Sequence, residues 1–333
     1  MVKRVGNLMP RIAETENLRE AFLRAARGKT GKREVLEFRD RLDDNLEQIR
    51  NRLLDGTYQF GDYHFFTIYD PKKRIICAAP FQHRVVFHAM MRICHPVFDD
   101  FQIYDSYASR IGKGTYKALE RTQYFCKRYR WFAKLDVCKY FDSIDHKVML
   151  QQLSRLFKDR QLLLYFQELL ASYETSPSCG LPIGNLTSQY FANHYLSLAD
   201  HLAKEEIRMP ATVRYMDDML FFSNDVCQLK DDLGKLSDWI ADYLHLTLPP
   251  IIINKVQFGI PFLGYVVYAD GLRLNHRSIR RFRRKVSDMD KYYWLNMMPE
   301  KEIASRGSCL FAFVNKAHTD ALKRKLYDEG QYS

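Results

Sequence analysis

Long apolar runs are missing from this sequence: no stretch approaches the length of a membrane-spanning helix, and the N-terminal segment is charged, unlike a secretion signal. The seven cysteines are odd in number, scattered, and never spaced C-x-x-C. This pattern argues against a disulfide framework or a cysteine zinc site and fits a reducing compartment. Internal repeats and low-complexity tracts are also lacking. We therefore expect a cytoplasmic protein without a membrane partner.

The composition is that of a globular protein with a basic surplus. Hydrophobic residues make up 47% and aromatic residues 14% of the 333 residues, enough for a sizeable core and two or three subdomains. Lys and Arg number 51 against 40 Asp and Glu, which gives a net charge of +11. Such a surplus favours a polyanionic partner, either nucleic acid or an anionic membrane surface.

Two adjacent carboxylates, Asp217 and Asp218, stand between short apolar runs. The pattern predicts a β-hairpin with the acidic pair at its tip. Neighbouring carboxylates repel each other, and their hard oxygen atoms suit Mg²⁺, which takes one or two carboxylates plus substrate phosphates. For the pair by itself, a solvated turn is the alternative interpretation.

A further carboxylate, Asp136, ends a short apolar strand at 131–135. Burying it costs free energy unless it is paired or bound to a metal, so Asp136 is a candidate third ligand beside the acidic hairpin. Aromatic residues follow at Tyr140 and Phe141, and Asp145 is the expected N-cap of the next helix.

Basic residues gather in two places. A predicted β-hairpin at 63–69 and 74–78 carries cations at its tip and return, and Arg84 lies one turn into the helix that follows. These cations could be solvated, or they could grip a triphosphate, with Arg clasping it bidentately. A predicted helix at 277–286 carries an almost one-signed row of cations, for which we favour phosphate-backbone binding over a solvated face.

The remaining segments predict helices and turns. Residues 17–58 predict two helices, and a Gly/Pro turn at 180–185 precedes a helix that starts at Thr187 or Ser188 and runs to about Ile207. The chain after residue 271 is expected to be a separate helical subdomain.

Four sequence blocks, which follow one another in the same order as in the family, resemble a reverse transcriptase over roughly residues 63–267. Residues 132–137 are similar to the first catalytic block, 215–218 to the second, and 262–265 to the block that grips the primer. Between them, Ile183-Gly184 and Ser188-Gln189 stand where most relatives have Gln-Gly and Ser-Pro. This variant is similar to the reverse transcriptases of diversity-generating retroelements, a bacterial lineage close to group II intron enzymes.

The resemblance implies an α+β, right-hand polymerase fold. Its fingers are expected at 1–111 and 144–187. A palm, formed by an antiparallel sheet with helices on one face, is expected at 112–143 and 188–270. A small helical thumb is expected at 271–333.

The resemblance also implies RNA-directed DNA synthesis by in-line phosphoryl transfer with two Mg²⁺ ions, for which Mn²⁺ can substitute. Asp136 and Asp217 would bridge the ions, Asp218 would assist, and the Val137 carbonyl would be a backbone ligand. Phe141, five positions after Asp136, corresponds to the aromatic steric gate that excludes a ribose 2′-OH. Core packing is the alternative for Phe141.

Two sets of contacts follow from the resemblance. The expected dNTP contacts, beside Phe141, are Lys72, Lys73, Arg74, Arg84, Ile183, Gly184, Gln189 and Lys255. The expected nucleic-acid contacts are Tyr215, Met216, Leu263, Gly264, Tyr265, Arg277, Arg280, Arg281 and Arg284. Lys255 would protonate the leaving pyrophosphate or be a plain surface lysine. Ile183 cannot make the polar contacts of the usual Gln, which predicts weaker nucleotide discrimination, unless it merely packs the loop.

The implied partners are a template-repeat RNA, the RNA/cDNA duplex, dNTPs and a small basic helical accessory protein, in a bacterial or phage-encoded system that makes cDNA with errors opposite adenine. One alternative is a reverse transcriptase of another bacterial lineage, intron-like or active in phage defence. Another is a non-catalytic nucleic-acid-binding protein on a degenerate polymerase fold. An RNA-dependent RNA polymerase is disfavoured by Phe141, since such enzymes must admit the 2′-OH.

Overall fold

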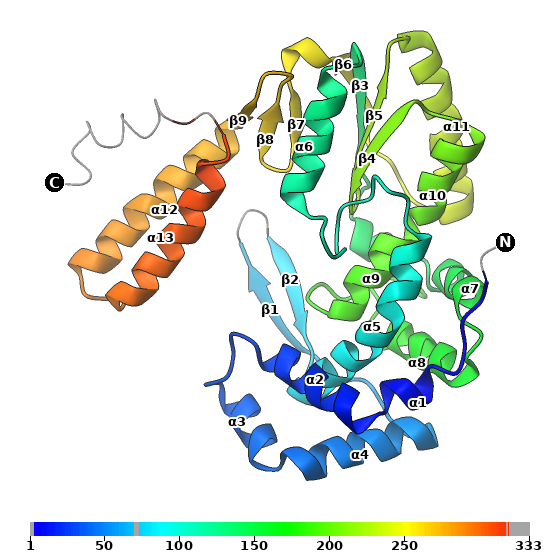
Figure 1. Cartoon of the computed structure of the whole chain (residues 1–333), viewed down its shortest axis with the longest axis vertical. Helices are drawn as coiled ribbons and strands as arrows, with labels where there is room; N and C mark the ends of the chain where they lie inside the picture. The colour runs from blue at the N-terminus through cyan, green and yellow to red at the C-terminus, as the bar shows by residue number, and fades with distance from the viewer. Residues whose placement is uncertain (1–2, 70–72, 318, 320–333) are drawn as a thin grey trace.

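The computed structural model describes residues 3–69, 73–317 and 319. Helices form its N-terminal part, in the lower half of Figure 1, where α2 (Thr15–Ala26) packs against α5 (Phe81–Phe101). The smaller helices around this pair are α1 (Met9–Ile12), α3 (Arg33–Asp40) and α4 (Leu42–Asp55). The sequence predicted two helices over 17–58, and the structure has three, because the backbone leaves helical geometry at Arg41 (φ −125, ψ 43).

A two-stranded antiparallel hairpin, β1 (His64–Ile68) and β2 (Arg74–Ala78), projects from this helical part (Figure 1). The register pairs His64 with Ala78 and Ile68 with Arg74. The predicted hairpin is thereby confirmed. Lys72 lies outside the described residues.

The central sheet has the strand order β4-β5-β3-β6, and its neighbouring strands pair antiparallel. Its strands are β3 (Trp131–Leu135), β4 (Ala211–Tyr215), β5 (Asp218–Ser223) and β6 (Ile252–Lys255). Alternation along each strand gives the sheet two apolar faces. The face that carries Ala133 and Phe221 belongs to the main core. It is covered by α9 (Leu186–Tyr195), α10 (Ser197–His201) and α11 (Val226–Leu244).

The opposite face of the sheet carries Phe132, Leu220 and Phe222 and belongs to a second core cluster. Here α6 (Thr115–Cys126) covers the sheet, with the rings of Phe125 and Phe222 5.3 Å apart. The α+β polymerase fold is confirmed, but helices cover both faces of the sheet rather than one, because both faces are apolar and need cover.

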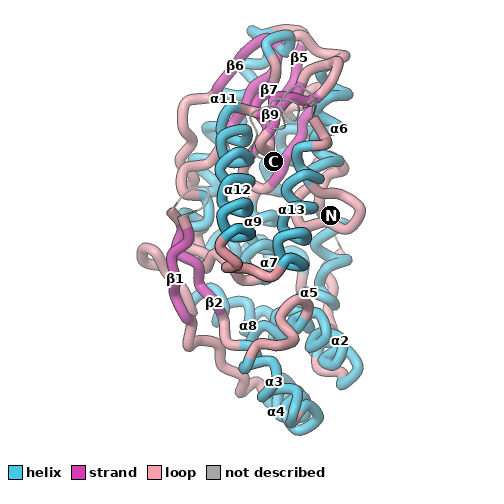
Figure 2. Tube along the Cα trace, turned by 90° about the vertical axis from the view of Figure 1, so that its left-hand side faces the viewer, coloured by secondary structure: helices cyan, strands magenta, loops and turns pink. Residues whose placement is uncertain are grey.

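A second sheet, in the order β7-β8-β9, completes this cluster with β7 (Ile260–Phe262), β8 (Tyr265–Val267) and β9 (Leu272–Leu274). It leads into α12 (His276–Trp294) and α13 (Glu300–Val314), which lie side by side in Figures 1 and 2. The chain after residue 271 was expected to be helical, and β9 corrects this, since Leu272–Leu274 pairs with β8. The division into fingers, palm and thumb at the stated boundaries stays a prediction.

The connection between the two acidic segments is helical. It contains η1 (Tyr140–Ser143), α7 (His146–Leu156) and α8 (Arg160–Ala171). Asp145 caps α7 as predicted, accepting the Val148 N–H at 2.9 Å. The next helix differs from the prediction: Asn185 is its N-cap residue, and the chain from 186 to 206 is divided into α9, α10 and the π-helical turn η2 (Leu202–Glu206). The short helix η3 (Val256–Phe258) follows β6.

None of the helices within 3–69 and 73–317 has both the length and the apolar character needed to cross a membrane.

Candidate active site

The predicted acidic hairpin is formed by β4 and β5, with Tyr215 paired to Asp218 across a tight turn at Met216 and Asp217. Met216 adopts the left-handed conformation (φ 58) that closes the turn. Asp136 directly follows β3, whose last residue Leu135 pairs with Met219 of β5. Antiparallel pairing therefore brings Asp136, Asp217 and Asp218 to the same end of the sheet.

Asp217 is a strongly perturbed carboxylate. Its pKa is raised to about 6, mainly by burial and also by the negative charges of Asp136 and Asp218, while a backbone hydrogen bond and the Arg74 guanidinium act in the opposite direction. A carboxylate in this situation is stabilised in its charged form by an added cation. The perturbation also shows that Arg74, on β2, lies within electrostatic range of the acidic turn.

Asp218 has a partner that the sequence analysis missed. The Lys134 ammonium donates to Asp218 Oδ2 and to the Pro261 carbonyl, each at 3.0 Å. Burial raises the pKa of Asp218, and Lys134 counteracts this. Lys134 neutralises Asp218, so Asp136 and Asp217 remain the better pair for a cation. A lysine two residues before Asp136 in an otherwise apolar strand was the available signal.

The chemistry of these residues fits a hard divalent cation, although no group of three or more His, Cys, Asp or Glu side chains in the described part of the chain is arranged as a finished metal site. The Val137 N–H donates to Asp136 Oδ1 at 2.9 Å and fixes the orientation of that carboxylate. Asp218 Oδ1 is buried and accepts no hydrogen bond from the described residues, although the Lys134 ammonium is 3.0 Å away. Oxygen donors left incomplete by the protein suit an ion that also takes substrate phosphates.

The raised pKa of Asp217 predicts a pH-dependent stability. The folded protein holds this proton more tightly than the unfolded chain, so the contribution of Asp217 is fully present below its usual pKa of 3.8 and is lost as pH rises to about 6. Without divalent cations, the free energy of unfolding of the wild type should fall by up to about 3 kcal/mol relative to Asp217→Asn over this range. Urea unfolding of both proteins at several pH values measures this difference. Parallel pH curves would contradict the prediction.

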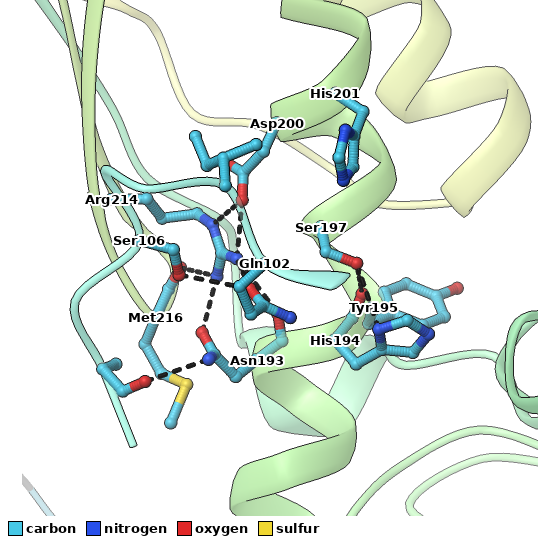
Figure 3. Close-up of polar contacts among 12 residues, drawn as sticks. Gln102, Ser106, Asn193, His194, Tyr195, Ser197, Asp200, His201, Arg214 and Met216 are labelled. Atoms are coloured by element: carbon cyan, nitrogen blue, oxygen red, sulfur yellow. Dashed lines mark hydrogen bonds and ion pairs between the residues drawn. The ribbon is translucent and has the colours of Figure 1, made fainter. Parts of the chain in front are cut away.

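A buried polar cluster next to the acidic turn is centred on Arg214, whose side chain is 1% exposed. Its guanidinium donates to Asp200 Oδ2 at 2.7 Å and to Gln102 Oε1 and Asn193 Oδ1, each at 2.8 Å (Figure 3). It also donates to the Met216 carbonyl at 3.1 Å. Burying an arginine is costly unless its donors are satisfied, and here they are.

The Arg214 cluster holds the backbone of the acidic turn in position. The Met216 carbonyl belongs to the residue before Asp217, so its hydrogen bond with Arg214 ties the turn to α9 and α10. The Arg214 backbone is held as well, with its N–H donating to Asp105 and its carbonyl accepting from Tyr107, both at 2.9 Å. Sequence analysis missed this role, although an arginine inside an apolar strand was visible.

The candidate steric gate and the loop containing Ile183 are connected. Phe141 is half-buried in η1, and its carbonyl accepts the Leu181 N–H at 2.7 Å. Two residues further on, the Ile183 carbonyl accepts the Cys77 N–H of β2 at 2.8 Å. Backbone hydrogen bonds thus join the gate segment, this loop and the β1–β2 hairpin into one wall.

The backbone geometry and the close packing at position 184 explain why this residue is a glycine. Its φ is 121, and a Cβ there would meet the Cys77 carbonyl oxygen and Ile76 Cγ2 at 3.0 Å. Close approach to β2 therefore requires glycine. Gln189 is exposed on α9. Whether these two residues contact a nucleotide stays a prediction.

The structure separates the cations that were predicted to bind the triphosphate. Lys73 and Arg74 are exposed on the hairpin, and Arg74 acts on Asp217. Arg84 instead forms an ion pair with Glu34 at the start of α3. Lys255 is not near the carboxylates: β6 runs antiparallel to β3 and pairs Lys255 with Trp131, five residues, or about 17 Å of strand, from Asp136. Strand register thus removes Lys255 as the acid for pyrophosphate.

The residues predicted to grip nucleic acid are divided similarly. Tyr265 is fully buried, and its hydroxyl donates to the Phe313 carbonyl of α13 at 2.8 Å. It therefore joins β8 to α13 and is not available for nucleic acid. Leu263 and Gly264 form the β7–β8 turn and stay candidates, as do the half-buried Tyr215 and Met216.

The predicted arginine helix is confirmed as α12. Phe282 and Val286 are buried against α13 and the second sheet. The four candidate arginines are exposed. Arg277, Arg280 and Arg284 lie on the opposite face at helical spacing, whereas Arg281 lines the groove between α12 and α13.

An antiparallel sheet with three carboxylates at one end, a flanking basic hairpin and a C-terminal helical pair define a nucleotide-adding polymerase. The family model for "Reverse transcriptase (RNA-dependent DNA polymerase)" matches residues 70–280. The chain belongs to this family, whose members are RNA-directed DNA polymerases that use divalent metal ions.

Two curated proteins are similar to this chain in sequence, and a solved structure is similar in fold. The chain is 25% identical over 173 residues to the putative COX1/OXI3 intron 1 protein of Saccharomyces cerevisiae, covering 49% of this chain and 21% of that one. It is 25% identical over 136 residues to nuclear intron maturase 2, mitochondrial, of Arabidopsis thaliana, covering 36% and 18%. The chain thus spans about a fifth of these relatives. Apo telomerase from Candida tropicalis shares the fold, with a TM-score of 0.52 at 11% identity, covering 65% and 49%.

Proposed function

We propose that this reverse transcriptase copies a template-repeat RNA into cDNA with frequent errors opposite adenine, as part of a diversity-generating retroelement. The observation that carries the proposal is the loop at 181–185, where an aliphatic residue, Ile183, stands in the wall between the steric gate and the hairpin. The partners we propose are the template RNA, the RNA/cDNA duplex, dNTPs and a small basic helical accessory protein, in the cytoplasm of a bacterium.

The proposed site uses Asp136, Asp217 and the Val137 carbonyl to hold two Mg²⁺ ions, with Asp218 assisting while paired to Lys134. When bound, such ions stabilise negative charge on the transferred phosphate and on the oxygens that flank it. Arg74, which lies within electrostatic range of Asp217, and its neighbour Lys73 would bind the triphosphate, and the Arg214 cluster holds the acidic turn in place. The Phe141 ring would clash with a ribose 2′-OH, which favours dNTPs.

The loss of fidelity follows from the chemistry of Ile183. Discrimination that relies on a hydrogen-bonding group is strong, because a wrong partner leaves that group unpaired. An aliphatic side chain offers no such group, so correct and incorrect nucleotides differ less in binding free energy.

Restoring a polar side chain should therefore restore discrimination. We expect Ile183→Gln to lower misincorporation opposite template adenine about tenfold, which is the effect of roughly one hydrogen bond to the base pair or its support. Single-nucleotide extension on templates that differ only at the copied base measures the ratio of wrong to right incorporation.

Ile183→Leu is the matched control, because it keeps the position aliphatic and should leave the ratio within about twofold of wild type. An unchanged ratio in Ile183→Gln, with extension intact, would contradict the role given to Ile183.

The similarity to intron proteins favours a second candidate, an intron-like reverse transcriptase of ordinary fidelity. The same assay separates the two. A wild-type protein that misincorporates equally rarely opposite all four template bases would support the intron-like enzyme.

A further inference from the structure

A cleft of about 850 Å³ opens at the end of the central sheet that is remote from the carboxylates. We call it the rear cleft and define it by Tyr129, Arg130, Trp131, Lys255, Tyr268 and Arg273. Trp131 begins β3, and Asp136 follows its other end, so the cleft lies roughly 17 Å along the strand from the acidic site. It is therefore not part of the catalytic site.

The rear cleft combines cations with aromatic rings. The Arg273 guanidinium carbon lies 4.5 Å from the Tyr268 ring centroid, and the Lys255 ammonium lies 5.5 Å from that of Trp131. Arg130, Lys255 and Arg273 are exposed, and the lining contains one acid, Asp270. An exposed guanidinium laid over an aromatic ring leaves its second face available for stacking.

The basic surface continues beyond this cleft. A neighbouring groove of about 470 Å³ shares Tyr129 and Arg130 and adds Lys127 and Arg128. Arg128 in turn lies over Tyr124, 3.6 Å from its ring centroid. The result is a continuous surface on which positive charges alternate with aromatic rings.

We propose that the rear cleft binds a single-stranded segment of the RNA template, outside the duplex that is being copied. The inference rests on the proposed function in one respect: that function identifies the bound RNA as the template. Proteins bind single strands by tracking the phosphates with cations while bases stack on aromatic rings or guanidinium planes, and both elements occur here. An acidic protein would use the cations but would leave the stacking surfaces without a purpose.

The test needs a probe that reports on the rear cleft alone. A short RNA/DNA duplex at saturating concentration first occupies the polymerase site, without dNTPs. A fluorescent 12-nucleotide oligouridine is then titrated by anisotropy. Since no nucleotide addition is required, failure here is distinct from failure of the proposed function, which primer extension measures.

We expect wild type to bind the oligouridine alongside the duplex, and Arg130→Glu with Arg273→Glu to weaken this binding at least tenfold. The salt dependence should also become shallower, by roughly 1.4 units of the logarithmic slope for two lost phosphate contacts. Lys230→Glu with Lys235→Glu, exposed on α11, makes the same change in net charge elsewhere and should weaken binding less than twofold. Thermal unfolding confirms that both variants are folded.

Three results would overturn the inference. The duplex could displace the oligouridine completely, which would mean a single site. The two double variants could behave alike, which would reduce the effect to the general field of a basic protein. An abasic 12-nucleotide chain could bind as tightly as the oligouridine, which would remove base stacking and leave only a phosphate-binding surface.

Discussion

Asp217→Asn should reduce Mg²⁺-dependent primer extension on an RNA template by at least roughly a thousandfold, because it removes half of the carboxylate pair that we propose holds the cations. The same change removes a charge that is costly in the absence of a cation, since burial and two neighbouring carboxylates already raise the pKa of Asp217. The variant should therefore be folded and inactive, and more stable than wild type at pH 7 in the absence of divalent ions.

The measurement is single-turnover extension with dNTPs and, separately, with rNTPs. Asp231→Asn, an exposed position on α11, is the matched control and should extend at the wild-type rate. Wild type should use dNTPs in strong preference to rNTPs if Phe141 is the gate. Extension above a tenth of the wild-type rate in Asp217→Asn would contradict the assignment of this residue.

Arg214→Met should cause the second large effect, on stability and activity together. It leaves the buried Asp200 carboxylate without its guanidinium partner, which should lower the free energy of unfolding by about 3–5 kcal/mol. It also releases the Met216 carbonyl, so we expect the rate of extension at saturating dNTP to fall about a hundredfold, as for other displaced catalytic groups. Urea unfolding and single-turnover extension measure the two effects.

A second substitution separates positioning from folding. Arg214→Met combined with Asp200→Leu removes both buried charges, and stability should recover by about 2 kcal/mol or more. Activity should not recover, because nothing holds the Met216 carbonyl in the double variant. Recovery of both would show that Arg214 acts only through stability.

The acidic site could be predicted from the sequence because its signals are local. The hairpin, the carboxylate after β3 and the Asp145 cap each depend on residues within one or two turns of chain, and the structure confirms all three. The Arg214 cluster could not be predicted in the same way. Its acceptors come from Gln102, Asn193 and Asp200, at sequence separations of up to 112 residues, which only the folded arrangement reveals.

The incorrect placements share one cause: a motif gives the residue but not the direction of its side chain or the register of its strand. Lys255 lies one strand away from Asp136 in the sheet, yet its register places it at the other end of β3. Tyr265 lies in a block that resembles the primer grip, yet strand alternation points its ring into the core. Register and facing depend on tertiary pairing, for which one sequence gives little information.

The wall that joins Phe141, the 181–185 loop and β2 couples two kinds of selectivity. Phe141 would select the sugar, and Ile183 would affect selection of the base. Backbone hydrogen bonds between their segments hold the two residues in a shared structural unit. A substitution that displaces the loop would therefore move the gate as well. An enzyme tuned to tolerate wrong bases by loosening this loop would begin to accept ribonucleotides, whereas a change confined to the Ile183 side chain would not. An enzyme that must misincorporate bases and still exclude ribonucleotides is therefore better served by a change of the Ile183 side chain than by a change in the backbone of the loop.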